Sequence, residues 1–74
     1  NMQKWEYLWR YFYEADSKNV NTSWKGKEYK GYQQCDQALN DIGELGWELV
    51  GITSSFKETG SWMQVQMLFK RPKG

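Results

Sequence analysis

Apolar and polar positions alternate along the first part of the chain. Every second residue from Trp5 to Tyr13 is aromatic, and Glu6, Leu8, Arg10 and Phe12 lie between them. A period of two with aromatic enrichment is typical of a β-strand. Turn-forming residues follow, and Ser23 to Tyr29 predicts a weak, charged second strand. We therefore expect residues 15–31 to form a hairpin arm.

The hydrophobic spacing changes to three and four after Gly31, which predicts an amphipathic helix over residues 32–46. The inward positions would be Tyr32, Cys35, Ala38, Leu39, Ile42 and Leu45. Gly46 should end the helix in a left-handed conformation, with Trp47 reaching back to Ile42. Gly43 inside a helix suggests close packing of that backbone on the sheet.

Residues 47–71 predict a second hairpin, with strands 47–56 and 62–71 around a loop at 57–61. Its second strand carries an apolar row that should lie under the helix: Met63, Val65, Met67 and Phe69. The expected fold is α+β, a small antiparallel sheet with one amphipathic helix packed on one face, in the order β-β-α-β-β. Residues 1–74 would form a single domain.

Three segments resemble a known family. They are Lys4-Trp5-Glu6-Tyr7, the run from Leu39-Asn40 through Gly43 and Gly46 to Trp47-Glu48-Leu49-Val50, and Phe69-Lys70-Arg71-Pro72. They resemble the small bacterial proteins grouped as "domain of unknown function 4177". The resemblance implies a helix packed on a small antiparallel sheet, and it brings no activity and no catalytic residues. Residues 14–31 depart from the family pattern.

Composition limits the classes of function. A chain of 74 residues has a small core, for which oligomerisation is a common support. One cysteine and no histidine exclude an intrachain disulfide and argue against zinc, so we expect no metal, no cofactor and a cytoplasmic protein. No run is apolar enough to span a membrane, and a net charge of +1 gives no strong attraction to nucleic acid.

Candidate catalytic residues are few. Without histidine, the remaining groups are Cys35 and nine carboxylates. Cys35 lies on the predicted apolar helix face, which favours a buried, inert thiol. Gly43 and Gly46 lie at a helix end, whereas a phosphate-binding loop precedes a helix. We therefore expect no enzymatic activity.

The aromatic row is longer than the helix expected to cover it. Four helical turns extend about 21 Å, and Trp5 to Tyr13 about 27 Å. We expect the uncovered end to hold an aromatic patch beside the arm, able to bind a partner or a flat nucleotide-like ligand. Its residues are Tyr11, Tyr13, Trp24 and Tyr29, with Arg10 and Lys25 available to a phosphate. Alternatively, the arm folds back and covers these rings.

The opposite sheet face would be open yet rich in apolar residues, which favours a homodimer. Its expected interface residues are Leu8, Phe12, Val50, Ile52, Phe56 and Leu68. The function expected is a non-enzymatic interaction module that self-associates through this face. The alternative is a single-stranded nucleic-acid or nucleotide-binding protein, since three lysines alternate with rings from Trp24 to Tyr32. Lysines also protect an ordinary edge strand.

Overall fold

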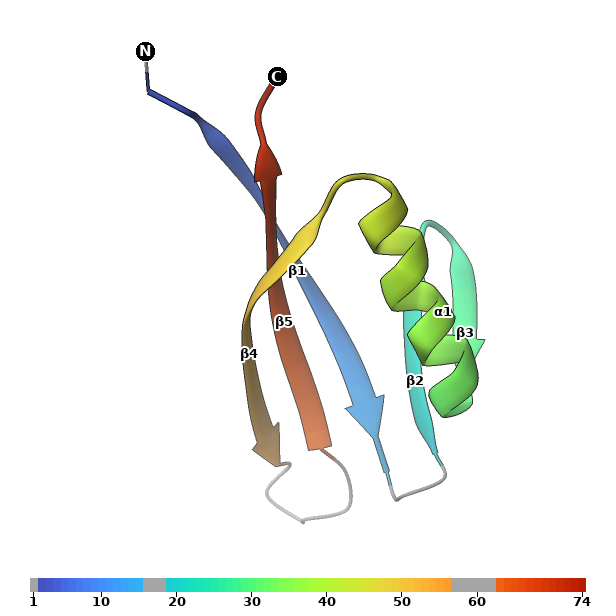
Figure 1. Cartoon of the computed structure of the whole chain (residues 1–74). Helices are drawn as coiled ribbons and strands as arrows, with labels where there is room; N and C mark the ends of the chain where they lie inside the picture. Colours follow the sequence, from blue (N-terminus) through green and yellow to red (C-terminus); the bar gives the residue numbers. More distant parts are fainter. Residues whose placement is uncertain (1, 16–18, 57–62) are drawn as a thin grey trace.

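The computed structural model describes residues 2–15, 19–56 and 63–74. It contains one antiparallel sheet and one helix, with the helix on one side of the sheet (Figure 1). The elements are β1 (Trp5–Glu14), β2 (Val20–Trp24), β3 (Lys27–Lys30), α1 (Gly31–Glu44), β4 (Glu48–Phe56) and β5 (Met63–Pro72). The predicted α+β class is confirmed, although the order is β-β-β-α-β-β.

The additional strand comes from the arm. A tight turn at Lys25 and Gly26 divides it into β2 and β3, and both residues have positive φ, 50° and 80°. Two-residue hairpin turns with positive φ at both positions match the twist of the flanking strands, and glycine adopts this conformation readily. The segment from Ser23 to Tyr29, predicted as one strand, therefore belongs to two short strands. Asp16, Ser17 and Lys18 of the predicted turn lie outside the described residues.

The spatial order of the strands is β3-β2-β1-β5-β4, so β1 is central. It pairs with β5 along its whole length, from Trp5↔Pro72 to Glu14↔Met63, which brings the two ends of the chain together (Figure 1). The C-terminal hairpin is present as predicted, with a β-bulge between Leu49 and Gly51. Its predicted loop at 57–61 and Trp62 lie outside the described residues.

Helix α1 follows β3 directly and packs on β2 and β3 (Figure 1). Its buried residues are Cys35, Ala38 and Ile42, and Leu39 is half-buried against them. Tyr32 and Leu45, both predicted to point inward, are largely exposed. The expectation that the Gly43 backbone packs closely on the sheet is also wrong, because a Cβ added to Gly43 would meet nothing within 4 Å.

The helix ends as the sequence predicts, slightly earlier than residue 46. Gly46 has a φ of 88° and donates its backbone N–H to the Gly43 carbonyl at 2.9 Å. Trp47 then packs half-buried against the core, with the Arg71 guanidinium 4.3 Å from its ring centre. A left-handed glycine thus turns the chain from α1 toward β4.

The core lies between α1 and one face of the sheet. Its sheet residues are Phe12, Val20, Trp24, Tyr29 and Phe69. The apolar row predicted under the helix is partly correct, since Phe69 is buried and Val65 and Met67 pack against this cluster. Leu8 and Phe12 share this face, because Leu8 pairs with Phe69 and Phe12 with Val65.

Candidate functional site

The helix covers the opposite face of β1 from the one predicted. Phe12 is only 4% exposed in the core, whereas Trp5, Tyr7, Trp9, Tyr11 and Tyr13 are 38–61% exposed on the uncovered side. We call this uncovered side the aromatic face. The expectation that the helix covers part of this row is wrong, because Val20, Thr22 and Trp24 of the arm pack on the Phe12 side and bring α1 there.

Uncharged polar groups lie beside the rings on β5. Tyr11 pairs with Gln66 and Tyr13 with Gln64, whose amide nitrogen donates to the Tyr13 hydroxyl at 3.3 Å. At the other end of β1, the Lys70 ammonium lies 4.1 Å from the centre of the Trp5 ring. The face therefore combines flat rings with amide groups at the Tyr13 end and carries a cation at the Trp5 end.

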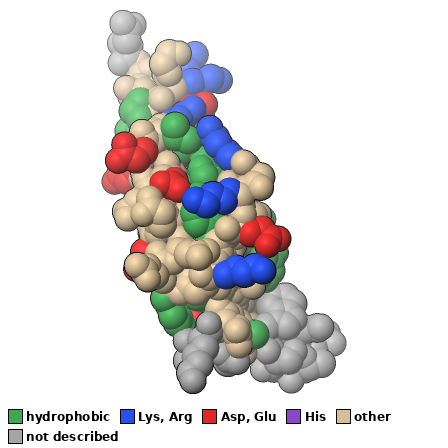
Figure 2. All heavy atoms as spheres, turned by 90° about the vertical axis from the view of Figure 1, so that its right-hand side faces the viewer, with side chains coloured by type: hydrophobic (Ala, Val, Ile, Leu, Met, Phe, Trp, Pro, Cys, Tyr) green, Lys and Arg blue, Asp and Glu red, His purple; other side chains and the backbone are tan. Residues whose placement is uncertain are grey.

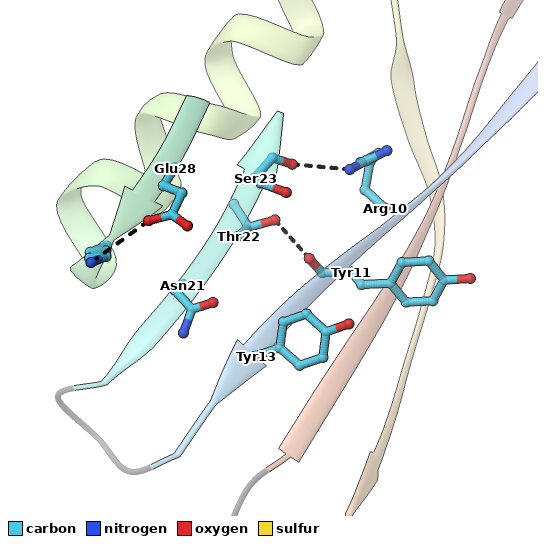
Figure 3. Close-up of a pocket in the computed structure, with 8 residues that line it drawn as sticks. Arg10, Tyr11, Tyr13, Asn21, Thr22, Ser23 and Glu28 are labelled. Atoms are coloured by element: carbon cyan, nitrogen blue, oxygen red, sulfur yellow. Dashed lines mark hydrogen bonds and ion pairs between the residues drawn. The ribbon is translucent and has the colours of Figure 1, made fainter. Parts of the chain in front are cut away.

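Strands β1 and β2 pair only at Tyr13↔Asn21 and Glu14↔Val20, and side chains bridge the adjoining gap. The Thr22 hydroxyl donates to the Tyr11 carbonyl at 2.7 Å, and the Arg10 guanidinium donates to the Ser23 carbonyl at 3.1 Å (Figure 3). Since side chains replace ladder hydrogen bonds here, the sheet surface is hollowed beside Tyr13.

This depression has a volume of about 380 Å³. It is lined by Arg10, Tyr11, Tyr13, Asn21, Thr22, Ser23, Glu28 and Lys30. The lining groups are mostly hydrogen-bonding, and the Lys30–Glu28 ion pair at 3.7 Å lies at its β3 side. The Arg10 Nε is buried without a hydrogen-bond partner among the described residues. A buried guanidinium N–H without an acceptor is unfavourable, and the same guanidinium is held by its hydrogen bond to the Ser23 carbonyl.

The predicted aromatic patch is divided between the two sides of the sheet. Tyr11, Tyr13 and Arg10 do lie together at the depression. Trp24 and Tyr29 are instead 9% and 3% exposed on the helix side. The Trp24 ring has the Arg10 guanidinium 5.4 Å from its centre, and the Lys25 ammonium 5.7 Å. The expectation that Trp24 and Tyr29 join an exposed patch is therefore wrong.

Tyr29 connects β3 to α1. Its hydroxyl donates to the Asp41 carboxylate at 2.6 Å, and the Gln37 amide donates to the other carboxylate oxygen at 2.8 Å. The hydrogen bond to Asp41 raises the pKa of Tyr29, with further contributions from burial and from the Asp41 charge. The hydrogen bonds from Tyr29 and then Gln37 lower the pKa of Asp41, against the effect of burial and with help from Lys27. These groups stabilise the fold and do not face the depression.

The residues expected to form a dimer interface do not share one surface. Phe12 is in the core, Leu8 is half-buried against it, and Leu68 pairs with Trp9 on the aromatic face. Val50 and Ile52 are exposed on β4. Phe56 belongs to β4, but its side chain is outside the described part. The expectation that these six residues form one open face is therefore wrong.

The remaining chemistry-bearing groups form no further constellation. Cys35 is buried, and burial followed by the Asp36 charge raises the pKa of its thiol. Within residues 2–15, 19–56 and 63–74, no three histidine, cysteine or acidic side chains are grouped to hold a metal ion. No helix in that part of the chain has the length and hydropathy to cross a membrane.

Sequence reasoning missed five residues that line the depression. They are Asn21, Thr22, Ser23, Glu28 and Lys30. The available signal was Lys25-Gly26, a turn dipeptide that would have divided the arm into two strands and aligned Asn21 with Lys30. The alternation of Val20, Thr22 and Trp24 would then have placed Asn21 and Ser23 on the uncovered side.

Comparison with known proteins identifies a family and names no activity. No curated protein and no solved structure matches the chain. One family model does match, over residues 5–72, and its description is Domain of unknown function (DUF4177). That match runs from the first residue of β1 to the last residue of β5. The chain therefore belongs to the DUF4177 family.

Proposed function

We propose that this protein is a non-enzymatic binding module that holds a partner or small ligand on its aromatic face. The observation that carries the proposal is the row of five rings on the central strand, each at least 38% exposed. Large exposed apolar patches on small proteins mark interaction sites. Tyrosine and tryptophan are enriched at such sites because they offer a flat apolar surface together with a polar group.

The neighbours of the rings favour recognition by stacking and hydrogen bonding. Gln64 and Gln66 flank the row on β5, and Asn21 flanks it on β2. Surfaces built from rigid rings and small polar groups lose little side-chain entropy on binding and adapt to varied hydrogen-bonding partners. A flat ligand, or an aromatic side chain of a partner, would therefore stack on Tyr11 or Trp9 and be oriented by the amides.

The depression at the Tyr13 end supports a defined anchoring position. Its lining supplies donors from Arg10 and Lys30 and an acceptor from Glu28. Binding sites commonly combine apolar surface with a few polar groups that fix the orientation of the ligand. A planar molecule with one anionic group would satisfy both the rings and Arg10.

Single-stranded nucleic acid is a second candidate, favoured by one observation. A lysine lies near each end of the row, with Lys70 over the Trp5 ring and Lys30 beside the depression. Proteins that bind single strands combine stacking rings with cations that contact phosphates. The affinity would then fall steeply with salt, whereas stacking of an uncharged partner would change little.

The proposal can be tested by nuclear magnetic resonance with probes of known structure. A nucleoside monophosphate, an indole-containing peptide and a short single-stranded oligonucleotide would each be titrated while the tryptophan indole signals are followed. Trp5 and Trp9 lie on the aromatic face, and Trp47, which packs half-buried on the helix side beside Arg71, serves as an internal control. We expect saturable shifts at Trp5 and Trp9 and none at Trp47.

Matched variants locate the binding surface. Trp9→Ser should weaken the binding of a probe by about 1–3 kcal/mol, the range measured for stacking on one ring. Tyr32→Ser removes an exposed ring from the helix and should leave binding unchanged. Saturable binding that survives Trp9→Ser and Tyr11→Ser together, or the failure of all three probes to bind, would count against the proposal. Loss of binding at high salt for the oligonucleotide alone would favour the second candidate.

A further inference from the structure

The two outer edges of the sheet differ in length and charge. Strand β3 forms one edge with four residues, and three of them are charged: Lys27, Glu28 and Lys30. The side of the molecule on which β3 and α1 lie exposes basic and acidic side chains (Figure 2). Short strands with lysines discourage pairing with another chain, so β3 is a protected edge.

Strand β4 forms the opposite edge and lacks most of this protection. It has nine residues, and its only charged residue is Glu48 at the start. Leu49, Val50 and Ile52 are exposed, and Ile52 reaches 64%. The bulge between Leu49 and Gly51 interrupts the beginning of the strand, but pairing with β5 is regular from Ile52 to Phe56. No strand in the described part of the chain pairs with the outer edge of β4. A nine-residue edge with one charge, at its first residue, and exposed apolar side chains at Leu49, Val50 and Ile52 readily accepts another strand.

We propose that β4 pairs antiparallel with β4 of a second copy of this chain, which joins two five-stranded sheets into one. An antiparallel strand pair has a two-fold axis, so a single strand can serve as both halves of the interface. With that axis near Thr53, the two Glu48 carboxylates lie about 33 Å apart along the pair. This separation exceeds the screening length of about 8 Å at physiological salt, so the two Glu48 charges do not repel each other across the pair.

The charges on the two edges explain why β4 pairs with β4 of a second copy and why assembly ends at two copies. Pairing of β4 with β4 leaves only the two β3 strands as outer edges, and both are charged and short. Pairing of β4 with β3 would instead repeat without end, and Lys27, Glu28 and Lys30 oppose it. The closed pair therefore removes the one edge that is open to uncontrolled association.

The same pairing extends the apolar helix-side surface. Leu49 and Ile52 pair with Phe69 and Met67 on the helix side, beyond the strands on which α1 packs. The two-fold axis would bring both copies of Ile52 to the centre of the joined sheet, and each Leu49 would lie about 13 Å from the axis along its strand. The axis stands perpendicular to the sheet, so both aromatic faces lie on one side. The interface is separate from the aromatic face, and either proposal can fail without the other.

Molar mass in solution tests the pairing. Light scattering on the full chain should give twice the chain mass of 8.9 kDa, decreasing on dilution. Ile52→Lys places a lysine on the β4 edge and should return the mass to that of one chain. Tyr7→Lys is the matched control, since Tyr7 is 61% exposed on the aromatic face, and this variant should remain dimeric. Both positions are exposed, so circular dichroism should show folded variants.

Amide hydrogen exchange gives a second readout that does not depend on a variant. Amides of Ile52 to Phe56 that face away from β5 should become protected as protein concentration rises, while amides of β3 stay unchanged. A wild-type chain that is monomeric at high micromolar concentration would overturn the proposal. A dimer broken by Tyr7→Lys and retained by Ile52→Lys would also overturn it and assign association to the aromatic face.

Discussion

The Tyr29 hydroxyl donates a hydrogen bond of 2.6 Å to the Asp41 carboxylate and thereby fastens β3 to α1. The two residues are twelve positions apart and lie on the elements that form one side of the core. The bond requires a protonated tyrosine and is stronger to an ionised than to a neutral carboxyl, so it makes folding depend on pH at both ends of the scale.

Stability should decline in both acid and alkali because of this pair. Asp41 has a lowered pKa in the folded state, so its contribution is present above the unfolded pKa of about 4 and is lost as pH falls. Tyr29 has a raised pKa, so its contribution is present below the unfolded pKa of about 10 and is lost as pH rises. The free energy of unfolding, measured with urea from pH 3 to pH 11, should be constant around neutral pH and should fall in acid and in alkali.

Tyr29→Phe should lower the free energy of unfolding at neutral pH and reduce its fall in both acid and alkali. Part of the fall in acid should remain, because Gln37 still donates to Asp41. Tyr7→Phe is the control, since Tyr7 is exposed and lies away from β3 and α1. If the two variants have the same pH profile, the pair contributes nothing to the pH dependence.

Two glycines, one inside α1 and one just beyond its end, should respond oppositely to alanine. Gly46 has a φ of 88°, so Gly46→Ala should lower the free energy of unfolding by about 1–2 kcal/mol. Gly43 is helical with open space around it, so Gly43→Ala should raise that free energy by about 0.5–1 kcal/mol. Urea denaturation of both variants measures the difference. Equal effects would contradict the assigned ends of α1.

Cys35 should react with thiol reagents only when the core opens. Burial, followed by the Asp36 charge, raises the pKa of its thiol, which lowers the fraction of reactive thiolate. Modification of the native protein should therefore be slow and should accelerate with urea in parallel with unfolding. A Cys35→Ala, Ser55→Cys variant places the thiol on an exposed position of β4 and should react at once. Fast modification of native Cys35 would show that the core is open.

Arg71 should stabilise the corner between α1 and β4. Its guanidinium pairs with Glu6, donates to the Leu45 carbonyl at 2.7 Å and stacks on Trp47. Arg71→Lys keeps the charge but loses the planar group that makes these contacts together, so we expect a loss of about 1 kcal/mol after allowance for partial exposure. Lys30→Gln removes an exposed ion pair and should change stability by less. Thermal melting of both variants checks the difference.

The sequence by itself determined the elements whose hydrophobic period is unambiguous. Cys35, Ala38 and Ile42 recur at helical spacing, and all three are buried. The conformation of Gly46 followed from local backbone sterics, since an L-amino acid resists the left-handed region. The structure of the arm was harder to predict, because its strands are only five and four residues long and a turn dipeptide was the one clear local signal.

Only the tertiary structure decided which face of β1 the helix covers. Both faces of this strand carry large apolar side chains, with Trp9 and Tyr11 on one and Leu8 and Phe12 on the other. The period of two assigns residues to faces but does not say which face is buried. Pairing of Glu14 with Val20 placed the arm, and through it α1, on the Phe12 side. The exposed row of rings and the depression depend on where the arm lies, and the open β4 edge depends on the long-range pairing of β1 with β5, which no local pattern encodes.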